Sequence, residues 1–108
     1  MGIQHCEPGT VVNLLHLDTR LPSEATFALV KTKQMEVIRM LLPQGKKIPM
    51  HKVTGEITVQ CMVGRITFNV ESEAHEMKAG DWLFLSGSQE HSLEAFEDSV
   101  LLITILLV

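Results

Sequence analysis

The chain has 108 residues, which is long enough for one domain but too short for two. Of these residues 45% are hydrophobic and 20% charged, a composition typical of a globular protein. Its net charge is −4, and residues 66–108 carry eight acidic side chains against Lys78 alone, while the earlier basic residues are dispersed. This distribution excludes a basic surface that could follow a phosphate backbone, so no nucleic-acid partner is expected.

The first residues lack the basic segment and apolar stretch of a secretion signal. With two cysteines in total, Cys6 and Cys61, the chain is expected in the reducing cytoplasm with both thiols free. The longest apolar stretch, Val100 to Val108, is too short to span a bilayer, so no membrane association is expected.

Short segments rich in β-branched and aliphatic residues recur along the chain, with turn residues between them and no convincing amphipathic helix. The expected strands are Val11–Leu15, Thr26–Val30, Met35–Leu42, Glu56–Val63, Ile66–Val70, Trp82–Leu85, His91–Phe96 and Val100–Val108. Eight strands in this length predict an all-β sandwich or barrel. We interpret residues 1–108 as one domain, with 1–25 as an N-terminal strand or arm and 35–107 as the barrel.

Two segments show how the strands should face. In the segment that begins at Glu56, alternation places Glu56, Thr58, Gln60 and Met62 on one face, which we expect to line a cavity. The opposite face is wholly apolar and needs cover from another sheet or another subunit. The segment from Val100 onward is apolar on both faces, which favours a homodimer.

Two spaced motifs bear a family resemblance. The first reads Gly45, five residues, His51-Lys52-Val53, two residues, Glu56, seven residues, Gly64. The second reads Gly80, five residues, Ser86-Gly87-Ser88, two residues, His91. Both resemble the motifs of the cupins, small proteins with a double-stranded β-helix, or jelly-roll barrel, often described as RmlC-like. Val53 stands where cupins usually place a second histidine, and Ser86 and Ser88 replace the usual proline and glycine.

The resemblance implies a divalent transition metal (iron, manganese, nickel, copper or zinc) held by His51, Glu56 and His91, with Gln60 as a further weak ligand or hydrogen-bonding group. It implies a small-molecule ligand in a pocket that includes Val53, Thr58, Met62 and Leu93, and oxygenase- or isomerase-like chemistry. No nucleotide cofactor is expected, because the sequence has no phosphate-binding glycine loop.

The alternative is a metal-free cupin that binds a small molecule, or serves as a sensor or assembly module, without catalysis. Val53 favours this alternative. Outside the family register, His51 is most simply an exposed histidine and Glu56 a solvated turn residue.

Overall fold

The computed structural model describes residues 6–15 and 26–108, and within these ranges all regular structure is β-strand. The nine strands are β1 (Phe27–Lys31), β2 (Met35–Leu42), β3 (Lys47–His51), β4 (Ile57–Val63), β5 (Arg65–Val70), β6 (Glu73–Lys78), β7 (Trp82–Leu85), β8 (His91–Ala95) and β9 (Ser99–Leu106). No helix in this part of the chain is long and apolar enough to cross a membrane.

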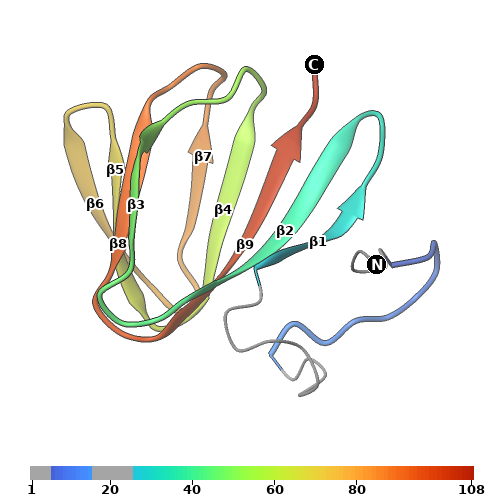
Figure 1. Cartoon of the computed structure of the whole chain (residues 1–108), viewed down its shortest axis with the longest axis horizontal. Helices are drawn as coiled ribbons and strands as arrows, with labels where there is room; N and C mark the ends of the chain where they lie inside the picture. Colours follow the sequence, from blue (N-terminus) through green and yellow to red (C-terminus); the bar gives the residue numbers. More distant parts are fainter. Residues whose placement is uncertain (1–5, 16–25) are drawn as a thin grey trace.

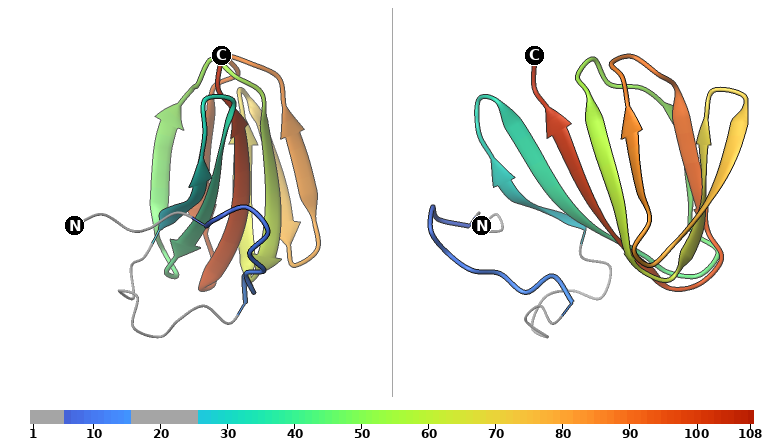
Figure 2. Two further views of the ribbon diagram at one scale, coloured as in Figure 1. Left: turned by 90° about the vertical axis from the view of Figure 1, so that its right-hand side faces the viewer. Right: turned by 180° about the vertical axis from the view of Figure 1, so that it is seen from behind.

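The strands form two antiparallel sheets that face each other (Figures 1 and 2). One sheet has the order β1-β2-β9-β4-β7 and the other the order β3-β8-β5-β6. Since successive strands repeatedly change sheet, the chain closes around one interior, as in a jelly roll. The expected all-β barrel is confirmed.

Most expected strands are present, several within one residue of their predicted bounds. The segment Val11–Leu15 is an exception, because it forms no strand. Two strands were not expected, β3 and β6. Both are edge strands, and β3 contains a proline while β6 is rich in charged residues, so neither shows the apolar pattern by which a strand is recognised.

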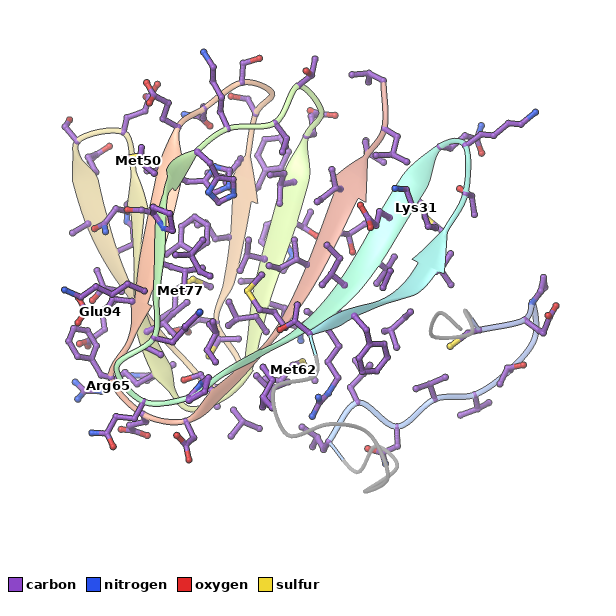
Figure 3. All side chains as sticks on the ribbon, viewed as in Figure 1. Lys31, Met50, Met62, Arg65, Met77 and Glu94 are labelled. Carbon is purple, nitrogen blue, oxygen red and sulfur yellow. The ribbon has the colours of Figure 1, made fainter. Side chains whose placement is uncertain are left out.

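The core lies between the sheets and is made of aliphatic side chains together with Cys61, Phe68 and Met77. Met77 is labelled in Figure 3. On β4 the buried residues are Ile57, Val59 and Cys61, while Thr58 and Gln60 are half-buried. The expectation that the polar face of this strand lines the interior is therefore wrong. The opposite sheet supplies the cover that the apolar face needs, and the polar face lies outside, where hydroxyl and amide groups keep their contact with water.

The segment 6–15 attaches to the five-stranded sheet through a backbone and a side-chain hydrogen bond. Cys6 N–H donates to the Leu29 carbonyl at 2.7 Å, and Arg39 Nε–H donates to the Leu14 carbonyl at 3.1 Å. Residues 1–5 and 16–25, which make up most of the predicted N-terminal strand or arm (1–25), lie outside the described residues.

Candidate functional site

Two histidines from neighbouring strands form the polar part of the barrel cavity, His91 buried within it and His51 exposed at its edge. His51 ends β3 and His91 begins β8, and the two residues are direct partners in the antiparallel ladder. Their ring centroids lie 4.2 Å apart with an interplanar angle of 61°, an edge-to-face arrangement. The two residues predicted from the separate motifs are thus brought together.

A bulge in β3 turns His51 toward the interior. Ile48 pairs with Leu93 and His51 pairs with His91, so three steps along β3 match two steps along β8. Regular alternation would send Ile48 and His51 to opposite faces, yet both line the same cavity. The extra residue of a bulge restores the inward direction.

The backbone fixes the orientation of both imidazoles. Nδ1 of His51 lies 2.9 Å from the Pro49 carbonyl oxygen, and Nδ1 of His91 lies 3.0 Å from that of Gln89. A carbonyl only accepts, so each Nδ1 carries the proton and donates it. In the neutral rings Nε2 is then the nitrogen with a free lone pair, able to accept from a ligand or to coordinate a metal.

The loops that carry the histidines are tied to each other. Ser88 N–H donates to the Val53 carbonyl at 2.9 Å, which joins the β7–β8 loop to the β3–β4 loop. The Gln89 side chain accepts from both the backbone N–H and the hydroxyl of Ser86, at 2.9 and 3.0 Å. Gln89 therefore holds the turn with its side chain and orients His91 with its carbonyl. Sequence reasoning did not single it out, although it lies inside the second motif.

His91 is 5% exposed and stacks on Phe68, with centroids 5.7 Å apart and rings 12° from parallel. Burial lowers its pKa, because the charged imidazolium loses hydration. The Gln89 carbonyl opposes this shift, and the charge of His51 lowers the pKa further. At neutral pH His91 is therefore a neutral ring whose Nε2 accepts hydrogen bonds.

The histidines lie on a cavity of about 130 Å³ between the sheets. Its remaining walls are apolar side chains from both sheets: Ile38, Met40, Ile48, Val53, Ile57, Val59, Phe68, Leu93, Ile103 and Ile105. A cavity of about 150 Å³ with such a lining stays dry and takes up benzene in an engineered protein, so this one matches a ring or a short alkyl chain.

The other predicted site residues divide into two groups. Val53 and Leu93 line the cavity as expected. Thr58, Gln60 and Met62 do not, because they lie on the outer face of β4, and Glu56 is exposed just before that strand. The residues of this segment that line the cavity are Ile57 and Val59, each one position from an expected one. The expected pocket was out of register by one residue, which exchanges every side chain between the two faces.

The donor set does not fit a catalytic metal centre with three protein ligands. Across residues 6–15 and 26–108, no three His, Cys, Asp or Glu side chains are grouped so that they could hold a metal ion. His51 and His91 contribute two imidazoles, and the cavity-lining residues closest to them in sequence, Ile48, Val53 and Leu93, are aliphatic. These side chains offer no lone pair to complete a ligand set.

Cys61, the cysteine of the barrel strands, is a core residue. Cys61 is fully buried, and its thiol lies within reach of the Val63 and Gly64 carbonyls. Burial, followed by the charge of Asp81, raises the pKa of this thiol, which keeps it protonated and poorly nucleophilic.

Two facing antiparallel sheets around a cavity, with a histidine from each motif at its rim, define the fold of a small cupin. Solved structures agree with this assignment. The chain superposes with a TM-score of 0.80 on a cupin superfamily protein from Desulfitobacterium hafniense DCB-2, at 10% identity over 96% of this chain and 95% of that one. A conserved protein of unknown function from Streptococcus pyogenes gives a TM-score of 0.79, at 18% identity over 98% and 94%.

KdgF from Halomonas sp. is a further neighbour, with a TM-score of 0.74 at 17% identity over 90% of this chain and 93% of that one. No protein-family model and no curated protein matches the sequence. The likeness therefore establishes the fold, and the function has to be argued from the site.

Proposed function

We propose that this cupin binds a small, mainly apolar organic molecule in the barrel cavity without a metal ion. A hydroxyl or N–H group of the ligand donates to Nε2 of His51 or His91. One observation carries the proposal: the described lining is apolar throughout except for two imidazoles whose Nδ1 atoms are already engaged by backbone carbonyls.

Physical chemistry favours such a ligand over a charged one in the inner cavity. Each buried methylene contributes about 0.8 kcal/mol, so an alkyl or ring body gains affinity from the aliphatic walls. A charged group beside Ile57 and Val59 would lose its hydration with no ion partner to replace it. A neutral donor opposite Nε2 satisfies both requirements and fixes the direction of the ligand.

A divalent transition metal at His51 and His91 is the second candidate. It is favoured by the pairing of the two rings, each of which leaves Nε2 with its lone pair. The oxygenase or isomerase chemistry expected from the motifs would need Glu56 or another ligand to join this pair. Glu56 is exposed and outside the cavity lining, which makes this candidate the weaker one.

The deciding experiment compares ligand binding in the presence and absence of metal. Hexan-1-ol is titrated into protein dialysed against a chelator, and the methyl signals of Ile57, Val59 and Ile103 are followed by NMR. We expect saturable shifts that remain when the chelator is present and weaken in His91→Phe. Binding that disappears on dialysis and returns with zinc or manganese would overturn the proposal and favour the metal site.

Elemental analysis of untagged protein, purified without chelator, gives an independent measure. The metal-free proposal predicts far less than one metal ion per chain in the wild type and in His91→Ala alike. A near-stoichiometric metal content that falls in His91→Ala would establish the second candidate instead.

A further inference from the structure

A second cavity adjoins the first one. It measures about 440 Å³ and is lined by Thr26, Met40, Leu41, Leu42, Pro43, Lys46 and Ile48. Two of these side chains, Met40 and Ile48, also line the inner cavity. The two spaces therefore share part of their walls, one residue from β2 and one from β3.

The topology explains why the barrel is open on this side. β2 belongs to the five-stranded sheet and β3 is an edge strand of the four-stranded sheet, so no ladder of hydrogen bonds joins them. The connection between them crosses from one sheet to the other at the lower end of the barrel in Figure 1. Side chains alone close this gap, and Met40 has the torsional freedom to move aside for a ligand.

The charge at this opening differs from that of the inner cavity. Lys46 lines the outer space, and within the described part of the chain no carboxylate forms an ion pair with its ammonium group. Lys47, the next residue, lies instead beside a groove on the outer face of the four-stranded sheet, with Asn69 and Glu94. One lysine of the pair thus serves the opening and the other does not.

From this arrangement we infer that the ligand is a linear hydroxycarboxylate of medium chain length. Its carboxylate stays at the side opening beside Lys46, its alkyl chain passes between Met40 and Ile48, and its terminal hydroxyl donates to Nε2 of His51 or His91. The inference rests on the proposed function, which gives the hydroxyl end of the ligand, and adds a negatively charged carboxylate at the other end.

The distance between Lys46 and His51 sets the length of the ligand's alkyl chain. Lys46 and His51 are five residues apart along an extended strand, about 16 Å between their Cα atoms at 3.3 Å per residue. The bulge shortens this distance, and the lengths of the lysine and histidine side chains reduce the gap that a ligand has to span. A chain of the length of ω-hydroxyoctanoate spans the remainder, whereas ω-hydroxybutanoate reaches one end alone.

The test measures the affinities of ω-hydroxyoctanoate, ω-hydroxybutanoate and octan-1-ol by calorimetry at low ionic strength. Lys46→Met keeps the length of the side chain and removes its charge, and Lys47→Met is the matched control on the outer face. We expect Lys46→Met to weaken the binding of ω-hydroxyoctanoate up to about five-fold, the upper end of what one solvent-exposed ion pair contributes. Octan-1-ol should bind all three proteins equally, and ω-hydroxybutanoate should gain nothing from Lys46.

The outcomes separate this inference from the proposed function. If octan-1-ol binds but ω-hydroxyoctanoate is no weaker in Lys46→Met, or is weakened as much in Lys47→Met, the side opening is not the carboxylate site and the inference fails alone. If neither octan-1-ol nor ω-hydroxyoctanoate binds the wild type, the cavity is no apolar ligand site and both proposals fail.

Discussion

Replacing Ile57 with glutamate should convert the cavity into a metal site. Ile57 is one of two inward residues of β4, with Val59, that line the same cavity as His51 and His91. The substitution Ile57→Glu adds one carboxylate to two imidazoles, which is the donor set of an open facial triad. If the aliphatic lining is what prevents metal binding, this single change should create it.

The magnitude follows from the burial of Ile57, which is 4% exposed. Loss of a buried isoleucine costs about 1.5–3 kcal/mol, and an unpaired buried carboxylate adds to this cost or takes up a proton. Without metal we expect the variant to be about 3–5 kcal/mol less stable than the wild type. Metal at a hundred times its Kd returns about 2.7 kcal/mol, or roughly 10–20 °C in Tm for a domain of this size.

The assay is thermal unfolding with and without zinc or nickel, together with calorimetric titration of the metal. Thr58→Glu is the control, since it adds the same group one residue along the strand on the outer face. It should change neither Tm with metal nor metal affinity. The reasoning is refuted if Ile57→Glu gains no stability from metal, or if the wild type and Thr58→Glu gain as much.

The remaining predictions concern pH, backbone conformation and assembly. The lowered pKa of His91 means that the unfolded chain binds more protons as pH falls below about 6.5, so the free energy of unfolding should decrease there and level off below the folded pKa. Gly64→Ala should cost roughly 3–4 kcal/mol in urea unfolding, because φ is +89° and an added Cβ would meet Asp98 and Ser99; Gly80→Ala, with φ +97° and open space, should cost about 1–2 kcal/mol. The homodimer predicted from the apolar strands should appear in sedimentation at micromolar concentration, and Trp82→Ser should weaken it, since this side chain is 60% exposed on the outer sheet face.

Each of these has a clear contrary result. A pH profile that is unchanged in His91→Phe would assign the acid sensitivity to other groups. Equal costs for the two glycine variants would show that the close approach at Gly64 is relieved without strain. A monomer at all concentrations would remove the dimer and leave Trp82 as a solvent-facing residue.

The strands of the barrel were predictable because burial imposes a period on the sequence. The bounds of Met35–Leu42 and Trp82–Leu85 match those of β2 and β7, and the motif spacing brought His51 and His91 into one site. The strand bounds follow from the local apolar pattern, and the pairing of the histidines follows from the motif spacing along the chain. Both can be read from the sequence without knowing which strands are neighbours.

Which face of β4 points into the barrel could not be predicted in the same way. Alternation divides Glu56 to Val63 into two faces, but it does not say which face meets the opposite sheet. The polar residues Thr58 and Gln60 suggested a ligand site, whereas the barrel interior selected Ile57 and Val59. The bulge at Pro49 and Met50 was equally hidden, since it exists only in the pairing of β3 with β8.

That bulge absorbs an odd spacing without turning the imidazole away. Ile48 and His51 are three positions apart, and the bulge matches these three positions to two steps along β8, so both side chains line the cavity. Deleting one residue between them would leave two positions for two steps, and regular alternation would then keep both side chains on the cavity side. The extra residue is therefore dispensable for the direction of His51, and its contribution is the local bend and added twist of the edge strand that carries the imidazole.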